Sequence, residues 1–177
     1  IIKKIALAPE RNGVKEFVET VTDEGVVVAL GHSNATLEEA DVAVEAGASV
    51  FVHAYNGMRG LNHREPGMVG ALLTLQHVFS ELICDGHHVH PQAAEVLMEK
   101  AGHDHVALIT DCMMAGGMPD GNYNLGEFPV VVAEGTARLD TGNLAGSILK
   151  LKEAIKNVVD WGIATPAQAI MMASLVP

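Results

Sequence analysis

Five short apolar runs alternate with longer amphipathic segments, and this alternation limits the possible folds more than any other feature of the chain. The runs are Ile1–Leu7, Val26–Leu30, Ser49–Val52, Phe79–Cys84 and Val106–Thr110. Continuous apolar strands are typical of parallel sheets, because the crossover helices cover the strands and leave them little contact with solvent. Successive runs end roughly 20 to 30 residues apart, the length of one strand, one helix and two loops. We therefore predict an α/β fold that forms part of a (β/α)8 TIM barrel.

The segments between and after the runs carry helix signals. A helix is expected from Gly13 to Glu24, and Thr36 with Glu39 three residues later forms a capping box for a second helix that ends near Gly47. After the fifth run the pattern changes to short strands separated by glycines between Tyr123 and Leu139, which indicates a hairpin excursion after the strand that ends at Asp111. Helices then resume, one with Ile148, Leu151, Ile155 and Val158 on a single face and another from Thr165 to Ala173.

The number of strand–helix units is too small for a complete barrel. An eight-unit barrel needs about 200 residues or more, whereas this chain has 177 residues and shows five or six units. Its first apolar run lacks a preceding helix, and its last residues, Ser174–Pro177, resemble a continuing loop. We therefore expect residues 1–177 to be a fragment of a single catalytic β/α barrel domain, with early strands and the C-terminal end missing.

Composition excludes several classes of function. The formal net charge is −11 and no run of Lys or Arg occurs, which argues against a nucleic-acid partner. No apolar stretch approaches the roughly 20 residues that a membrane helix needs, and the first residues lack the features of a signal peptide. We expect a soluble, cytoplasmic protein with no membrane partner. Its two cysteines, Cys84 and Cys112, are expected to be reduced and mostly buried.

Four polar residues lie at or just after the ends of successive predicted strands: His32, His53, His88 and Asp111. In a parallel barrel the active site is built at the carboxyl ends of the strands, so these side chains should meet at one mouth. Neutral imidazoles are common ligands of divalent metals, which favours His32 and His53 as a ligand pair. Asp111 could accept a proton from a metal-activated water and deliver it to a leaving group. His88 is favoured as a substrate contact.

Other histidines have weaker claims to the site. His103 and His105 precede their strand, which places them at the opposite mouth of the barrel as surface-loop residues. His90 could continue an extended segment after His88, but Pro91 favours a loop or a helix start at position 90.

Arg64 lies in a loop, Asn62–Gly67, on the functional side of the predicted sheet. Its guanidinium is permanently charged and planar, which suits a phosphate group. The alternative is an Arg in contact with solvent that pairs with Glu65.

Eight segments of the chain together resemble the N-acetylglucosamine-6-phosphate deacetylase family of the amidohydrolase superfamily, and the resemblance covers essentially the whole chain. They are LAPE at 7–10, GHSNAT at 31–36, HAYNGM at 53–58, REPG at 64–67, DGHHV at 85–89, TDCM at 110–113, GMPDGNYNLG at 117–126 and LAGS at 144–147. Each segment alone is a weak signal, whereas the set is specific.

The resemblance implies an activity: deacetylation of N-acetylglucosamine 6-phosphate to glucosamine 6-phosphate and acetate. It implies that His32 and His53 bind a divalent cation, zinc or iron, with one or two ions per site. His88 would hold the substrate carbonyl, and Asp111 would be the catalytic carboxylate. The metal-binding glutamate of the family lies on an earlier strand outside this sequence, and Glu10 is expected to be a rim or structural residue.

The same resemblance implies how the sugar phosphate is held. Asn56 and Gly57 would contact it together with Arg64, which could reach across the interface of a homodimer, and the loop around Leu144 would line the acetyl pocket. Two alternatives remain open at this stage: another amidohydrolase, such as a cyclic amidase or a deaminase, and a non-catalytic protein that binds a sugar phosphate.

Overall fold

The computed structural model describes residues 1–177, and its larger sheet is entirely parallel. The strands lie side by side in chain order: β1 (Lys4–Leu7), β2 (Val27–Leu30), β3 (Val50–Phe51), β4 (Phe79–Ile83) and β5 (Val106–Ile109). Each strand falls within one of the five predicted apolar runs. The predicted α/β class with a parallel sheet is therefore confirmed.

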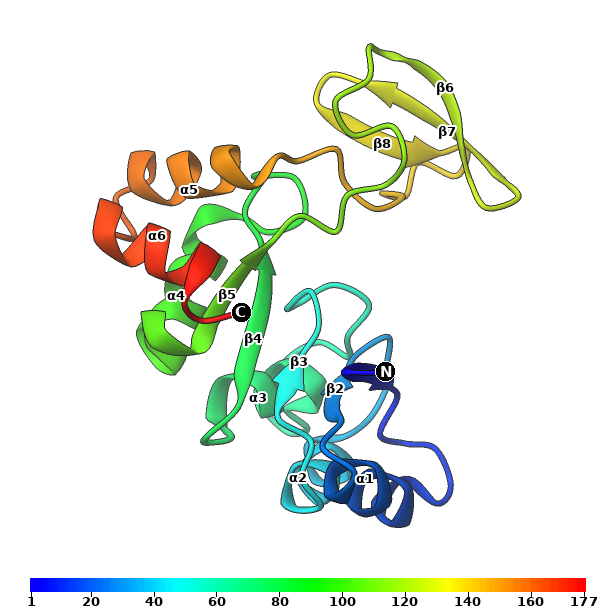
Figure 1. The fold of residues 1–177 in the computed structure, drawn as a ribbon, viewed down its shortest axis with the longest axis vertical. Helices are drawn as coiled ribbons and strands as arrows, with labels where there is room; N and C mark the ends of the chain where they lie inside the picture. Colours follow the sequence, from blue (N-terminus) through cyan, green and yellow to red (C-terminus); the bar gives the residue numbers. More distant parts are fainter.

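Helices follow the strands and cover them. They are α1 (Val14–Asp23), α2 (Leu37–Glu45), α3 (Gly67–Thr74), α4 (Pro91–Ala101), α5 (Leu151–Asp160) and α6 (Pro166–Ser174), with a short 3-10 helix, η1 (His103–His105), before β5. In Figure 1, α1 and α2 lie together beside β2 and β3, whereas α4, α5 and α6 gather beside β4 and β5. The main core lies between sheet and helices, where Leu30, Phe51 and Leu82 of the strands pack with Met68 and Leu97 of the helices.

The predicted helix boundaries agree with the structure at the capped ends. At the start of α2, Thr36 Oγ1 accepts a hydrogen bond from the Glu39 N–H at 3.2 Å, and Glu39 Oε2 accepts one from the Thr36 N–H at 2.9 Å. A cap of this kind stabilises a helix by about 1 kcal/mol.

The prediction that Ile148 shares a helix face with Leu151 is wrong. Ile148 precedes α5 and packs against the core of a second, smaller sheet.

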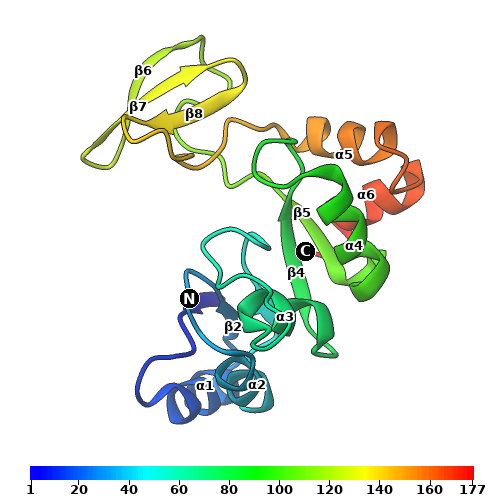
Figure 2. The same ribbon diagram turned by 180° about the vertical axis from the view of Figure 1, so that it is seen from behind.

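The excursion after β5 is a three-stranded antiparallel sheet rather than a hairpin. Its strands are β6 (Gly121–Leu125), β7 (Phe128–Ala133) and β8 (Thr136–Leu139). The turn between β7 and β8 has two residues with positive φ, Glu134 (51°) and Gly135 (77°), as tight hairpin turns require. Both views show this sheet standing away from the larger one at the end of two connecting segments (Figures 1 and 2).

The larger sheet is strongly curved, as an ion pair between two strands that are not neighbours shows. Lys4 of β1 pairs with Glu81 of β4, although two other strands lie between them. In a flat sheet three strand spacings, about 14 Å, would separate these positions.

The concave face of this sheet is open: a cavity of about 420 Å³ is lined by Val27, Phe79 and Ile109 among others. Val27 and Phe79 remain 40% and 37% exposed for this reason. The expectation that the apolar strands have little contact with solvent is therefore wrong at the first residues of β2 and β4.

The two cysteines are free but differ in environment. Cys84 at the end of β4 is buried, and burial together with the nearby Asp85 carboxylate raises the pKa of its thiol to about 12. Cys112 is exposed, contrary to prediction, because it follows Asp111 at the rim of the sheet, where the chain leaves the core. No helix of the structure combines the length and apolar character needed to cross a bilayer.

Candidate active site

Three of the predicted site residues have left-handed backbones two residues after strand ends. The φ angles are 47° at His32, 28° at His53 and 47° at Asp111, which follow β2, β3 and β5. This conformation costs a residue with a side chain about 1–2 kcal/mol, and such strain concentrates at functional sites. Here the three strained residues all lie at the carboxyl ends of the parallel strands.

His32 and His53 are in direct contact. Their Nε2 atoms lie 2.8 Å apart, and the rings meet edge to face with centroids 4.5 Å apart and an interplanar angle of 87°. His53 Nδ1 lies 3.1 Å from the carbonyl oxygen of Asn56, to which it can only donate, so the neutral ring keeps a lone pair on Nε2. Gly57 (φ 57°) leaves room for the pair, since a Cβ there would lie 3.2 Å from His32 Nδ1.

This imidazole pair fits a divalent cation. Two neutral Nε2 atoms at 2.8 Å need either a proton or a cation between them. Neutral imidazole nitrogens are common ligands of divalent metals. The two rings make only part of a ligand set, because no group of three or more His, Cys, Asp or Glu side chains in the chain is arranged to hold a metal ion.

A cavity of about 400 Å³ joins the imidazole pair to the other predicted residues. It is lined by His32, His53, Asn56, Gly57, His88, Asp111, Asn143, Leu144 and Gly146. All the predicted site residues except Arg64 therefore meet at the carboxyl ends of the parallel strands. Asn143 was not predicted, whereas Gly146 belongs to the LAGS loop that was expected to line the acetyl pocket. They flank Leu144, and the proximity of the loop to strand β5 could not be read from local sequence pattern.

His88 is held by a carboxylate that was not predicted to have a role. Asp85 Oδ2 lies 2.6 Å from His88 Nδ1, and both side chains are largely buried, with 9% and 7% exposed. Asp85 Oδ1 accepts hydrogen bonds from the backbone N–H groups of His87 and His88, each at 2.8 Å. Burial raises the pKa of Asp85, but these hydrogen bonds outweigh it and hold the pKa below its usual value. The available signal was the Asp three residues before His88.

The loop that carries Leu144 is fastened to the backbone of Asp111. The Ser147 N–H donates to the Asp111 carbonyl at 2.9 Å, and the Met113 N–H donates to the Ser147 carbonyl at 2.9 Å. The Ser147 hydroxyl also donates to the Thr110 carbonyl. These bonds bring the residues before Ser147 over the cavity, next to Asp111.

Arg64 lies outside the cavity. Its side chain is exposed and takes part in no ion pair of the structure, while its backbone N–H donates to Asn62 Oδ1 at 2.9 Å. The alternative pairing with Glu65 is wrong, because Glu65 pairs with Arg59. Arg64 thus leaves its charge available to a group outside this chain's own cavity.

The other histidines lie outside the cavity. His103 belongs to η1 rather than to a surface loop, and its Nε2 donates to the Ile163 carbonyl at 2.9 Å, which ties η1 to the segment before α6. His90 is the N-cap of α4, in agreement with the predicted helix start.

Glu10 has a structural contact. Its carboxylate accepts hydrogen bonds from the Ser33 hydroxyl at 2.7 Å and from the Asn34 N–H at 3.0 Å, and these two residues directly follow His32.

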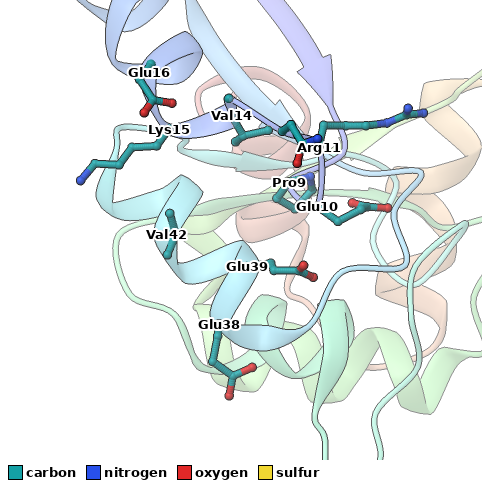
Figure 3. A pocket seen from close by; sticks show the side chains of 11 residues that line it. Pro9, Glu10, Arg11, Val14, Lys15, Glu16, Glu38, Glu39 and Val42 are labelled. Atoms are coloured by element: carbon teal, nitrogen blue, oxygen red, sulfur yellow. The ribbon is translucent and has the colours of Figure 1, made fainter.

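A second cavity, of about 410 Å³, lies between the first turns of α1 and α2 (Figure 3). Charged residues of both signs line it, but no histidine does. Two of its carboxylates already have backbone partners, Glu10 at Asn34 and Glu39 at the N-cap of α2. With no histidine in its lining, this cavity lacks the imidazole pair of the site described above.

No model of a protein family matches this sequence. The chain is 48% identical over 174 residues to N-acetylglucosamine-6-phosphate deacetylase of Vibrio furnissii. The aligned region covers 98% of this chain and 43% of the Vibrio protein. The chain is also 52% identical over 126 residues to a putative N-acetylgalactosamine-6-phosphate deacetylase of Escherichia coli K12, covering 71% of the chain and 75% of that protein.

Solved structures agree. A crystal structure of N-acetylglucosamine-6-phosphate deacetylase from Pasteurella multocida superposes with a TM-score of 0.94 at 30% identity, covering the whole chain and 46% of the other. The Mycobacterium smegmatis enzyme in complex with N-acetyl-D-glucosamine-6-phosphate gives 0.90 at 34% identity, covering 96% of the chain and 45% of the other. The chain thus spans less than half the length of these structures. The resemblance seen in the sequence is confirmed, and the chain belongs to the family of N-acetylglucosamine- and N-acetylgalactosamine-6-phosphate deacetylases.

Proposed function

We propose that this chain supplies most of the active site of an enzyme that hydrolyses N-acetylglucosamine 6-phosphate to glucosamine 6-phosphate and acetate in amino-sugar metabolism. One observation carries the proposal: the His32–His53 pair, His88 and Asp111 line one cavity of about 400 Å³. An imidazole pair, a proton-transferring carboxylate and a donor for a carbonyl oxygen are the groups that amide hydrolysis requires.

The domain is proposed to be part of a (β/α)8 barrel. Three features support this: all neighbouring strands are parallel, they follow in chain order, and the sheet curls until Lys4 and Glu81 pair across it. Strands β1 and β5 each have one unpaired edge, and apolar side chains such as Val27, Phe79 and Ile109 lie on the open concave face beside the Lys4–Glu81 pair. Further strands of the complete protein would pair with these edges and cover that face.

His32 and His53 are proposed to hold a divalent cation, zinc or iron, together with a carboxylate from outside this sequence. Such a cation lowers the pKa of a bound water and so supplies a nucleophile near neutral pH. The Asn56 carbonyl keeps the lone pair of His53 Nε2 available by accepting from Nδ1. Gly57 leaves the space that the His32 ring occupies.

The remaining residues carry the proton and orient the amide. As water attacks the acetamide carbon, Asp111 accepts the proton that water loses and a C–O bond forms. His88 donates a hydrogen bond to the carbonyl oxygen, on which negative charge develops. Asp111 then gives the proton to the nitrogen, the C–N bond breaks, and the amine and acetate leave. Leu144 offers an apolar wall to the acetyl methyl group.

The phosphate is proposed to bind away from the imidazole pair. Asn56 and Gly57 would contact the sugar phosphate from within the cavity. Arg64 lies outside the cavity and has no ionic partner in its own chain, so we assign it to the phosphate bound by a second copy in a homodimer. This arrangement would make each site depend on both subunits.

N-acetylgalactosamine 6-phosphate is a second candidate substrate, because the Escherichia coli K12 relative is named a putative deacetylase of that sugar. The two sugars differ at one hydroxyl. A cyclic amidase or deaminase finds no support among the relatives described above.

The test is acetate release by the complete protein that contains this chain. Both 6-phosphates, unphosphorylated N-acetylglucosamine and a cyclic amide should be compared at equal concentration. We expect hydrolysis of at least one 6-phosphate and a much lower kcat/KM without the phosphate. Tight binding of a 6-phosphate without acetate release would instead identify a non-catalytic binding protein.

A further inference from the structure

Asp85 contacts the ring of His88 from outside the cavity, since His88 lines the cavity and Asp85 does not. Its two oxygens have separate tasks. Oδ1 accepts from the backbone N–H groups of His87 and His88, which shapes the loop after β4. Oδ2 contacts only the ring nitrogen His88 Nδ1, at 2.6 Å. Because the side chains of Asp85 and His88 are 9% and 7% exposed, bulk water does not compete strongly for this contact.

The position of the shared proton follows from the chemistry of the two groups. Asp85 already receives two backbone N–H donors, and its lowered pKa is that of a carboxylate which stays ionised at neutral pH. An ionised carboxylate only accepts hydrogen bonds, so the proton in the 2.6 Å contact belongs to His88 Nδ1. The ring also lines the cavity, which leaves Nε2 as the nitrogen that can meet a substrate.

We propose that Asp85 is a positioning residue that fixes the Nδ1 proton of His88, so that His88 acts on the substrate carbonyl through Nε2 as an imidazolium ion. A neutral ring with its proton on Nδ1 would present a lone pair to the carbonyl oxygen, and the two acceptors would repel each other. Only the doubly protonated ring keeps the Asp85 contact and donates from Nε2 as well. The carboxylate beside the ring stabilises that positive charge.

This proposal rests on the proposed deacetylase function for its catalytic consequence, but not for its structural content. The decisive variant is Asp85→Asn in the complete protein. The Asn Oδ1 can still accept from both backbone N–H groups, so the loop keeps its bonds. The Asn amide nitrogen, however, can only donate to Nδ1, which removes the charge and moves the ring proton to Nε2.

Asp104→Asn is the matched control. Asp104 also contacts a histidine, with Oδ1 at 3.1 Å from His105 Nδ1, but its side chain is 71% exposed and the pair lies outside the cavity. The same change of charge is therefore made in an Asp–His pair that should not affect turnover.

The first measurement is the ¹⁵N chemical shift of the histidine ring nitrogens in protein labelled at histidine, with His88 assigned by the signal lost in His88→Gln. We expect both ring nitrogens of His88 to be protonated in the wild-type protein and only Nε2 to be protonated in Asp85→Asn. An unprotonated Nδ1 or Nε2 in the wild-type protein, or an Nδ1 unchanged by Asp85→Asn, would overturn the proposal.

The second measurement is the kinetics of acetate release. Asp85→Asn should lower kcat by on the order of 10- to 100-fold, the usual cost of losing a partner that orients an active-site histidine. KM should stay within about 2-fold, because the ring still offers a donor to the ground-state carbonyl. Asp104→Asn should match the wild type. Equal kcat values for Asp85→Asn and the wild type would refute the proposed effect of Asp85 on turnover. A wild-type protein that releases no acetate would refute the deacetylase function. In that case the ring-nitrogen measurement alone would decide whether Asp85 fixes the Nδ1 proton of His88.

Discussion

Gly146 lies directly against the carbonyl oxygen of Asp111, so close that a Cβ at position 146 would be 3.1 Å from that oxygen. Gly146 also has a φ of 61°, which residues with a side chain rarely adopt. The glycine therefore lets the Asn143–Ser147 loop approach the backbone of the proposed proton carrier. The loop hydrogen bond from the Ser147 N–H to the Asp111 carbonyl depends on this approach.

Gly146→Ala should lower kcat for acetate release more than it lowers stability. The left-handed backbone costs about 1–2 kcal/mol with any side chain, and the added methyl also pushes on Asp111. Gly142→Ala is the control, since Gly142 has a φ of 85° but nothing within 4 Å of an added Cβ. Both variants should lose similar unfolding free energy in urea, and only Gly146→Ala should lose turnover. Equal turnover of the two variants would mean that the contact with Asp111 is unimportant.

Asp111→Asn should nearly abolish turnover while leaving the metal in place. The amide cannot accept a proton from water, and losing a general acid–base group typically costs about 10²- to 10⁴-fold. His32 and His53 remain, so the metal content per subunit should match the wild type. Elemental analysis and acetate release on the same preparation check both points. Turnover within a few-fold of wild type would remove Asp111 from the role of proton carrier.

The site could be predicted largely because parallel strands end at the same edge. His32, His53, His88 and Asp111 each follow an apolar run, and the topology alone brings them together. The start of α2 could be predicted because its capping box involves only Thr36 and Glu39, which are three residues apart in the sequence.

What the sequence could not supply depends on contacts between distant segments. Asn143 lines the cavity because the loop after β8 returns to the end of β5. The sequence predicts a hairpin where the structure has three strands, because a turn of only two residues, Glu134 and Gly135, separates β7 from β8. The exposure of Val27 follows from the curvature of the whole sheet, which cannot be predicted from the sequence of a single strand.

His32→Gln should release the metal, because an amide is a much weaker ligand than imidazole and the His32–His53 pair would be broken. We expect most of the bound metal to be lost on dialysis, together with acetate release. His63→Gln is the control, because His63 is exposed and does not line the cavity. Retention of a full complement of metal by His32→Gln would show that the cation, if bound, is held elsewhere.

The carboxylate of Glu10 should stabilise the protein in a pH-dependent way. Burial raises its pKa, but hydrogen bonds from the Ser33 hydroxyl and from backbone N–H groups, with the nearby Arg11, bring the pKa below the usual 4.5. A carboxyl whose pKa is lower in the folded state binds protons more weakly there than in the unfolded chain. Its stabilising contribution is therefore fully present above about pH 4.5 and is lost as the pH falls through the folded-state pKa.

Glu10→Gln should accordingly be less stable than the wild type at pH 6, and the difference should shrink as the pH is lowered below 4.5. Urea unfolding of both proteins across this range measures the effect. Glu95→Gln serves as the control, because Glu95 is exposed in the middle of α4 and its side chain makes no hydrogen bond or ion pair in the structure. A Glu10→Gln difference that stays constant down to pH 3 would show that the loop after His32 is held by the shape of the side chain and not by its charge.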